Sequence, residues 1–360
     1  MKRVLAVLLA LAFWPAMATA QAQVFTFAFD APPAALTETV MTVVEGTTEV
    51  RLTFGGDCTL GGTAAGGARR FESYIRQHGF AYPFANLAAL LQADDLSLVN
   101  LEGVLSARRL ARVKKTFNFK GLPAYAAILQ EGGVECVTLA NNHALDYGAA
   151  GFRDTVQALE AAGIAYVDDH YVTVLQKDGV RVGFTASGLR INRKRFAAQA
   201  AALRELGCTV LVHVMHTGDE YAAYLTRAQR DTARYLADQG VQLVVGHHPH
   251  VVQGLEKLGS TMVAYSLGNL VFGGNTDPAD QDAMLLGATF RFLDGVPTGS
   301  QVTLWPLTIS GSPRMNDYQP ALVSGDAAQR VMEKVQATSG FSLAPYRDGI
   351  GAVQAVSDLR

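Results

Sequence analysis

The ten residues 241–250, with the sequence VQLVVGHHPH, give the clearest indication of the fold. Their first half is apolar and rich in valine, which favours a buried strand. Their second half places His247, His248 and His250 beside a glycine and a proline, which are residues that interrupt strands. We therefore expect a buried strand whose carboxyl end carries polar chemistry.

Five other apolar runs end in polar residues in the same way. In an open α/β sheet, the carboxyl ends of the strands line the crevice that binds ligands. The sequence therefore predicts that six strand ends meet at one site. The polar residues after the other five runs are Gly55-Gly56-Asp57, Asn100-Leu101-Glu102, Asn141-Asn142-His143 with Asp146, His216-Thr217-Gly218-Asp219-Glu220 and Gly268-Asn269.

Apolar runs alternate with helical patterns along the chain, which predicts an α/β fold whose sheets are covered by helices. The later strands suggest a second sheet or an antiparallel extension. Residues 177–179, Lys-Asp-Gly, are expected to turn a hairpin. The expected strands are 50–54, 96–99, 134–139, 171–176, 180–185, 209–215, 241–245, 261–266, 284–292 and 302–307; the expected helices are 84–91, 149–162, 225–238 and 327–335.

The first twenty residues have the pattern of a signal peptide. A basic start precedes an apolar run at 4–13 and Ala18-Thr19-Ala20, so we expect cleavage after Ala20 and export to the periplasm or the cell exterior. An uncleaved amphipathic anchor is the alternative. The run is too short to span a bilayer, so no stable transmembrane anchor is expected after cleavage. Residues 21–49 are interpreted as a leader, 50–310 as the main domain, and 311–360 as an extension with a closing helix and a weakly patterned end.

Composition excludes some functions. Without the first twenty residues the chain has 28 basic and 32 acidic side chains, a net charge of −4, which is unlike a general nucleic-acid binder. Three cysteines, Cys58, Cys136 and Cys208, cannot all pair within one chain, so no disulfide framework is expected.

The residue types at the strand ends suit a metal. Carboxylates and imidazoles together favour one or two divalent transition ions such as manganese, zinc or iron. Two such ions bridged by a carboxylate activate water and stabilise an in-line displacement at phosphorus. The alternatives are structural: Asp57 as a turn residue and Asp146 as a helix N-cap. Strand alternation predicts that His213 packs in the core and that His247 points away from His248.

The motifs at 56–57, 100–102, 141–148, 246–253 and 265–269 resemble the bacterial capsule-synthesis family called CapA, over residues 50–307. Members of that family are linked to poly-γ-glutamate capsule production. The family resembles the calcineurin-like metallophosphoesterases, which implies two sheets sandwiched between helices, an αββα arrangement.

The resemblance also implies roles for individual residues. It matches Asn142 and His143 to the family's Asn-His pair. Because imidazole titrates near working pH, we expect His143 to act as a general acid, and Asp146 is a second catalytic candidate. Thr59 stands where the phosphoesterases have a histidine, which puts one of two metal positions in doubt. Thr217 stands where this family usually has tryptophan. The implied metal ligands are Asp57, Glu102, Asn142, His216, His248 and His250.

A basic run between residues 107 and 120 reverses the acidic character of the chain. It contains three arginines, at 108, 109 and 112, and three lysines, but no acidic residue. We expect Arg108, Arg109 and Arg112, together with Asn269, to bind an anionic substrate near the site. A solvated loop without a ligand is the alternative.

Three functions agree with these features. The first is an exported metal-dependent hydrolase or transferase that acts on an anionic envelope polymer or a phosphorylated intermediate. The second is a non-catalytic subunit that binds or exports the polymer together with other capsule-synthesis proteins. The third is a solute-binding domain. Bound metal together with turnover favours the first of them, since membership of a family does not establish activity.

Overall fold

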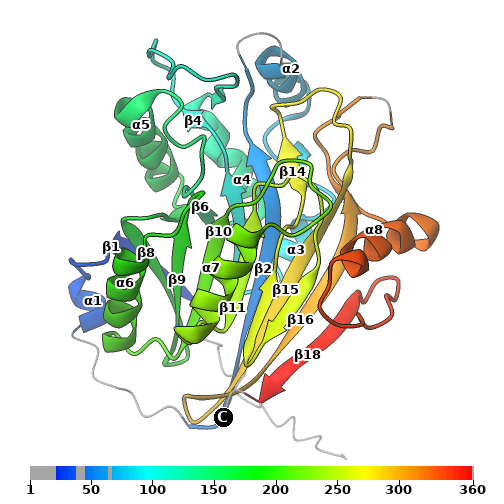
Figure 1. The fold of residues 1–360 in the computed structure, drawn as a ribbon. Coiled ribbons are helices and arrows are strands. Elements are labelled where there is room, and N and C mark those ends of the chain that lie inside the picture. The colour runs from blue at the N-terminus through cyan, green and yellow to red at the C-terminus, as the bar shows by residue number, and fades with distance from the viewer. Residues whose placement is uncertain (1–21, 38–44, 64–66, 314, 359–360) are drawn as a thin grey trace, which may run out of the picture.

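The computed structural model describes residues 22–37, 45–63, 67–313 and 315–358, so the expected signal peptide lies outside the described residues. Two large sheets pack face to face, with helices on their outer faces (Figure 1). The mixed α/β class predicted from the alternation of strands and helices is confirmed. Among the described residues, no helix is long and apolar enough to cross a membrane.

The first sheet has seven strands in the order β1-β8-β9-β10-β11-β13-β12. Strands β9, β10, β11 and β13 run parallel, whereas β1 and β12 pair antiparallel at the two edges. The predicted hairpin is confirmed, because Lys177 pairs with Val180 across the turn. The strands are β1 (Gln23–Ala28), β8 (Tyr171–Lys177), β9 (Val180–Ser187), β10 (Val210–His216), β11 (Leu243–His247), β12 (Leu255–Leu258) and β13 (Thr261–Ala264).

The second sheet runs β17-β16-β15-β2-β3-β6-β7, with β14 beside β2 and β18 beside β16. Its half from β2 to β7 is parallel, and its half from β15 to β17 is antiparallel. A small separate sheet pairs β4 (Val104–Leu105) with β5 (Lys120–Gly121). The strands are β2 (Thr47–Thr59), β3 (Leu96–Leu101), β6 (Cys136–Thr138), β7 (Ala165–Val167), β14 (Asn269–Phe272), β15 (Asp282–Leu293), β16 (Val296–Thr308), β17 (Ala321–Leu322) and β18 (Ala352–Asp358).

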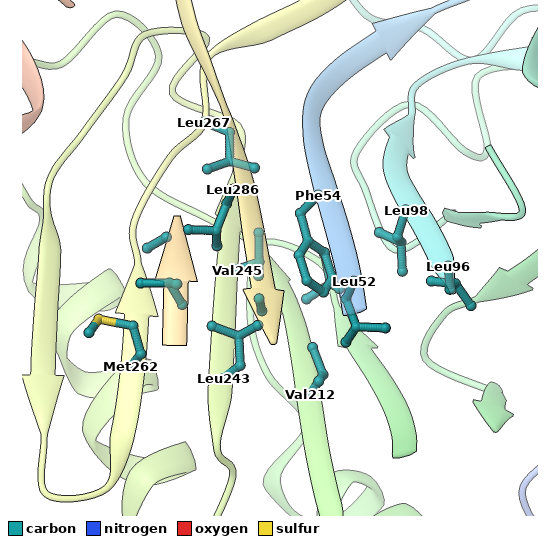
Figure 2. Close-up of a cluster of buried hydrophobic side chains, with 14 of the residues drawn as sticks. Leu52, Phe54, Leu96, Leu98, Val212, Leu243, Val245, Met262, Leu267 and Leu286 are labelled. Carbon is teal, nitrogen blue, oxygen red and sulfur yellow. The ribbon is translucent and has the colours of Figure 1, made fainter. Parts of the chain in front are cut away.

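The largest core lies between the two sheets. Figure 2 shows Phe54 and Leu98 of the second sheet near Val212 and Val245 of the first. These side chains come from alternate positions of their strands, so one face of each strand is directed at the other sheet. Burying large aliphatic and aromatic side chains of this kind stabilises a fold by roughly 1.5–3 kcal/mol each.

Helices cover the outer faces. On the first sheet, α6 (Arg193–Glu205) and α7 (Arg227–Asp238) pack over β10 and β11, while α1 (Ala34–Thr37) lies near β1. On the second sheet lie α2 (Gly67–His78), α3 (Ala88–Leu91), α4 (Ala126–Gly132) and α5 (Gly148–Ala161), with the 3-10 turns η1 (Tyr82–Phe84) and η2 (Pro123–Tyr125). The expected closing helix is α8 (Gly325–Ala337), whose Val331 and Val335 reach the core between the sheets.

The structure differs from the predicted elements in several places, and the helices α2, α4 and α6 were not predicted. Residues 84–91 form the end of η1 and the short α3 rather than one helix. Strand β1 lies within the expected leader, and β18 lies within the weakly patterned end. All three cysteines are free and buried.

Candidate functional site

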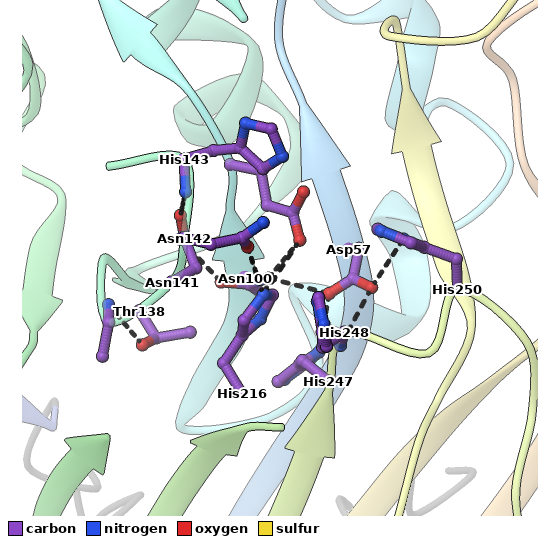
Figure 3. Close-up of polar contacts among 12 residues, drawn as sticks. Asp57, Asn100, Thr138, Asn141, Asn142, His143, His216, His247, His248 and His250 are labelled. Atoms are coloured by element: carbon purple, nitrogen blue, oxygen red, sulfur yellow. Dashed lines mark hydrogen bonds and ion pairs between the residues drawn. The ribbon is translucent and has the colours of Figure 1, made fainter. Parts of the chain in front are cut away.

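The candidate site lies directly beyond the core between the sheets, at the next inward-facing position of three strands. In β3 the inward positions Leu96 and Leu98 are followed by Asn100, and in β10 the inward valines 210, 212 and 214 are followed by His216. In β11 the inward positions Leu243 and Val245 are followed by His247. The period of two in each strand therefore directs polar side chains to the same face as the core residues. Figure 3 shows this polar layer.

Asp57 reaches the layer through a bulge in β2. Phe54 pairs with Leu98 and Asp57 with Asn100, so β2 has one more residue than β3 over this interval. The extra residue shifts the alternation, which turns Asp57 inward and leaves Cys58 on the outer face. Gly56 permits this path, because a Cβ atom there would lie 2.1 Å from the carbonyl oxygen of Gly268.

Asp57 is the centre of the site and is fully buried. Its Oδ1 accepts a hydrogen bond of 2.7 Å from Asn100 Nδ2, and its Oδ2 lies 3.1 Å from His250 Nδ1. The backbone N–H of His248 donates to Oδ2 at 3.3 Å. A carboxylate with this many donors is a permanent part of the interior, so the alternative of a simple turn residue does not fit.

His247 also contacts Asp57, which shows that the prediction for this histidine was wrong. Its Nδ1 lies 3.3 Å from Asp57 Oδ1, and its side chain is fully buried (Figure 3). We expected His247 to point away because it is adjacent to His248. The reason is strand alternation. Leu243 and Val245 face the core between the sheets, and His247 is the next residue of β11 on that same face.

Glu102 lies two residues beyond Asn100 and shares its face. Its Oε1 is 3.1 Å from Asn100 Nδ2 and 3.7 Å from His216 Nε2. Its Oε2 is buried and has no hydrogen-bond partner. A buried carboxylate oxygen without a partner is costly, by about 1–3 kcal/mol or more for a charged group, so this atom is suited to binding an ion.

The Asn142–His143 pair faces the same layer from the loop after β6. Asn142 Oδ1 lies 2.8 Å from His216 Nε2. His143 Nδ1 lies 2.8 Å from Asp146 Oδ2, and its ring packs against Phe119 with 4.3 Å between ring centroids. The residue at the N-cap of α5 is Tyr147, so the alternative of Asp146 as the N-cap is excluded.

Lys115 joins the basic run to this group. Its Nζ forms an ion pair with Asp146 Oδ1 and lies 3.1 Å from His143 Nδ1 and 2.8 Å from the carbonyl oxygen of Asn142. Lys115 was noticed in the basic run but was not predicted to contact the site. Its contacts hold His143 and Asp146 in place.

The ionisable side chains of the cluster shift one another's pKa values. Burial and the charge of Asp57 raise the pKa of Glu102 to about 8. Burial would lower the pKa of His250, but the charges of Glu102 and Asp57 outweigh it and raise that pKa to about 10. Burial would raise the pKa of Asp57, yet its bonds to His247 and His250 hold it well below its usual range. Burial holds the pKa of His216 well below its usual range. The positive charge of protonated His250 therefore compensates the negative charge of the buried carboxylates of Asp57 and Glu102.

The donor set fits a divalent metal. Ligand atoms of Asp57, Glu102 and His250 all lie within 4.8 Å of one another, and all three residues are buried. Glu102 Oε2 and His248 Nδ1 are buried without hydrogen-bond partners. Mixed carboxylate and imidazole donors are those that manganese, zinc and iron use. Thr59 is buried with its Oγ1 unpartnered and lies in β2 two residues after Asp57.

The predicted substrate residues lie in different settings. Arg108 forms a bidentate pair with Asp154 of α5, at 2.6 and 2.8 Å, so its guanidinium is already engaged. Arg109 is exposed. Arg112 lines a cavity of about 480 Å³ with residues 113–118 and Thr63. Asn269 Oδ1 lies 2.9 Å from His250 Nδ1, where it orients that imidazole.

His213 is a core residue, as strand alternation predicted. Its ring nitrogens lie 2.8 Å from Thr185 Oγ1 and 2.9 Å from Ser187 Oγ, both on β9. Phe196 of α6 packs edge-on against the ring at 5.4 Å between centroids. His213 therefore faces the helical layer, while His216 faces the site.

Two residues of the site were quoted in the motifs but assigned no role. Asn100 donates to Asp57 and Glu102, and its Oδ1 accepts a 3.0 Å bond from Asn141. Glu220 has a ligand atom within 4.8 Å of those of His248 and His250. The signal for Asn100 was its position two residues before Glu102 on one strand face, which strand periodicity makes visible.

Curated relatives are similar to this chain over part of their length. The capsule biosynthesis protein CapA of Bacillus anthracis is 28% identical over 253 residues, which are 62% of this chain and 60% of that protein. The PGA biosynthesis protein CapA of Bacillus subtilis (strain 168) is 28% identical over 244 residues, or 61% and 62%. The chain thus spans about three fifths of the length of these relatives.

A further relative and one solved structure were also found. A probable polyglutamine synthesis accessory protein of Mycobacterium tuberculosis (strain ATCC 25618 / H37Rv) is 28% identical over 226 residues, which are 53% of this chain and 59% of that protein. Zinc-bound Vps29 from Entamoeba histolytica aligns with a TM-score of 0.26 at 12% identity, over 63% of this chain and 96% of Vps29.

The family model described as "Bacterial capsule synthesis protein PGA_cap" matches residues 51–274. This segment holds the bulge of β2, the polar ends of β3, β10 and β11, and the loop of Asn142 and His143. Because the match extends over more than half of the chain, the protein belongs to the PGA_cap family of bacterial capsule synthesis proteins.

Proposed function

We propose that the protein is an exported metal-dependent hydrolase or transferase of the metallophosphoesterase type. Its substrate in this proposal is an anionic envelope polymer such as poly-γ-glutamate or a phosphorylated intermediate. The observation that carries the proposal is the buried trio of Asp57, Glu102 and His250, whose ligand atoms lie within 4.8 Å of one another. Buried acidic and imidazole groups at one point are best explained by a cation between them.

In this proposal Asp57, Glu102 and His250 hold the first metal ion, with Asn142, His216 and His248 available for a second. A bound divalent ion would supply Lewis acidity and a water molecule of lowered pKa. It would also take over the charge compensation that protonated His250 provides. Asn100 and Asn269 position these ligands through hydrogen bonds to Asp57 and His250.

The proton chemistry is assigned to His143. Asp146 Oδ2 accepts the Nδ1 proton of His143 in this assignment, which leaves Nε2 as the atom that exchanges a proton with the reacting group. Lys115 neutralises the other oxygen of Asp146, so the carboxylate orients the ring without carrying a free charge. Phe119 shields one face of the imidazole from water.

The class of substrate is inferred from charge and from the relatives. The relatives from the two Bacillus species are named for capsule and PGA biosynthesis. Arg112 and Lys114 line the cavity beside Lys115, and neither has an acidic partner within the described residues. Basic side chains beside a metal centre would attract carboxylate or phosphate groups.

Metal content and turnover test this proposal together. The mature protein, purified without chelators, should contain at least one divalent transition ion per chain by elemental analysis. It should then cleave either a generic phosphodiester, bis-p-nitrophenyl phosphate, or poly-γ-glutamate, and chelation should abolish the activity. An Asp57→Asn variant that retains its fold by circular dichroism serves as the inactive control. Protein free of metal, or metal-loaded protein inert on both substrates, would refute the enzymatic assignment.

A non-catalytic subunit that binds or exports the polymer is the second candidate. The observation that favours it is the cavity of about 480 Å³ lined by basic residues outside the metal cluster. In that case polyglutamate binds with a salt-dependent affinity and no product forms. Partners from the capsule-synthesis machinery would then supply the chemistry.

A further inference from the structure

Two loops beside the candidate site hold large apolar side chains in water. Val113 and Phe117 belong to the loop between β4 and β5, and Leu145 belongs to the loop after β6; these residues are 46%, 56% and 56% exposed. The first of these loops projects from the same end of the molecule as β4 and α5 (Figure 1). Single exposed apolar residues are common on protein surfaces, but a group of them marks a surface that another molecule covers.

Hydrogen bonds bring the two loops together. Val113 N–H donates to the carbonyl oxygen of Asp146, the residue directly after Leu145, at 2.9 Å. Asn118 is buried and joins the same segments, because its Nδ2 donates to the carbonyl oxygens of Val113 and Asp146 at 3.1 and 3.3 Å. Phe117 directly precedes Asn118, so all three apolar residues lie at this junction. We call Val113, Phe117 and Leu145 the apolar tip.

Basic side chains accompany the apolar tip. Arg109, Arg112 and Lys114 are exposed and take part in none of the ion pairs among the described residues. Arg108 and Lys115 of the same loop are instead paired with acidic side chains of the protein. The surface therefore combines unpaired positive charge with exposed apolar groups.

An anionic lipid bilayer offers a partner for both kinds of group. Its phosphate groups attract exposed lysine and arginine, and the boundary between headgroups and acyl chains takes up exposed aromatic and aliphatic side chains. A soluble polyanion pairs with the basic residues alone and leaves the apolar tip in water. The charged and apolar side chains together therefore favour a membrane over a soluble polymer as the partner of this tip.

We propose that the apolar tip and the three exposed basic residues beside it dock the protein reversibly on an anionic bilayer. The inference goes beyond the proposed function and depends on neither metal nor turnover. Docking would hold the candidate site at the lipid surface, because the ring of Phe117 stacks on Phe119 with 6.4 Å between centroids and Phe119 packs against His143. A substrate held at the membrane would then lie next to the site.

The test is co-sedimentation of the full mature chain with lipid vesicles. Vesicles of equal parts phosphatidylglycerol and phosphatidylcholine should bind the protein, and added salt or phosphatidylcholine alone should weaken the binding. The double variant Phe117→Ser with Leu145→Ser should bind about tenfold more weakly, because it no longer buries these side chains in lipid. Val296→Ser is the matched control and should bind as the wild type does. Val296 is 61% exposed but lies at the turn between β15 and β16, at the end of β2 opposite to Asp57.

Tryptophan fluorescence reports whether the tip enters the lipid. Phe117→Trp should show a blue shift of its emission when anionic vesicles are added, whereas Val296→Trp should show none. The mature chain has one tryptophan of its own, Trp305 in β16, which gives the same background in both variants. Equal spectra with and without vesicles for Phe117→Trp would show that this residue stays in water.

Other results would also overturn the inference. Wild-type protein that stays in the supernatant with anionic vesicles would do so, and so would a double variant that binds them with wild-type affinity. If the double variant loses binding to soluble polyglutamate as strongly as binding to lipid, the tip belongs to the polymer instead. Both replaced residues are exposed, so the melting temperature of the double variant should stay unchanged and show that it is folded. Metal content and turnover are measured separately, so the proposed function stands or falls independently.

Discussion

Replacing His213 by glutamine should make the protein less sensitive to acid, although it makes it less stable at neutral pH. Burial lowers the pKa of His213 to about 3, whereas an unfolded histidine titrates near 6.5. The folded state therefore keeps the ring neutral where the unfolded state takes up a proton. Stability from this residue is fully present above pH 6.5 and is lost progressively as the pH falls towards 3.

The size of the effect follows from these two pKa values. Each pH unit between them is worth about 1.4 kcal/mol, so acidification from pH 6.5 to 4.5 should remove about 3 kcal/mol from the wild type. His213→Gln removes this contribution. At pH 7.5 the variant should be less stable by about 1–3 kcal/mol, because the hydroxyl of Thr185 or Ser187 loses its partner.

The assay is urea unfolding at pH 7.5, 6.5, 5.5 and 4.5, with both proteins in excess chelator so that release of metal does not contribute. Curves of unfolding free energy against pH should converge as the pH falls. Metal content at pH 7.5, measured without chelator, should equal that of the wild type. Parallel curves between pH 6.5 and 4.5 would show that His213 is not neutral in the folded protein.

The other predictions concern the site and its surroundings. His250→Ala should lower bound metal by more than tenfold in elemental analysis, and retention of wild-type metal would remove His250 from the ligand set. Gly56→Ala should destabilise the fold by about 3 kcal/mol or more, since a Cβ would lie 2.1 Å from the Gly268 carbonyl oxygen; an unchanged melting temperature would contradict this. Arg112→Gln with Lys114→Gln should weaken polyglutamate binding and its salt dependence, whereas Arg108→Gln should change affinity little because Asp154 holds that side chain. Equal losses in both variants would return Arg108 to the binding surface.

The sequence predicts the buried strands well, because their apolar period is local information. Strands β3, β10 and β11 are mostly apolar before the residue where the site begins, so both their existence and their polar ends could be predicted. The hairpin of β8 and β9 was equally visible from its Asp-Gly turn. Strand β1 could not be predicted in this way, because its partner β8 lies about 150 residues further along the chain and only the folded sheet supplies the contact.

The site was predicted as a group of residues but not as a set of contacts. The bulge that turns Asp57 inward depends on the pairing with β3, which the local pattern of β2 does not contain. The inward position of His247 follows from strand alternation counted from Leu243, whereas we compared His247 only with its neighbour His248. Arg108 was assigned to substrate because its partner Asp154 lies 46 residues away, on a helix whose orientation the sequence does not give.

The segment that the family model matches ends before β15, a strand that pairs with β2. The match ends at residue 274, but β2 obtains one of its two lateral neighbours from β15 (Asp282–Leu293), which pairs with it from Thr47 to Phe54. In a polypeptide that stopped at 274, residues 47–54 of β2 would form an unpaired sheet edge. Leu52 and Phe54, which lie in the core between the sheets, would become exposed to solvent. The strand-end motifs therefore depend on the strands that follow them in the chain, and truncation after residue 274 should yield aggregates rather than a smaller folded protein.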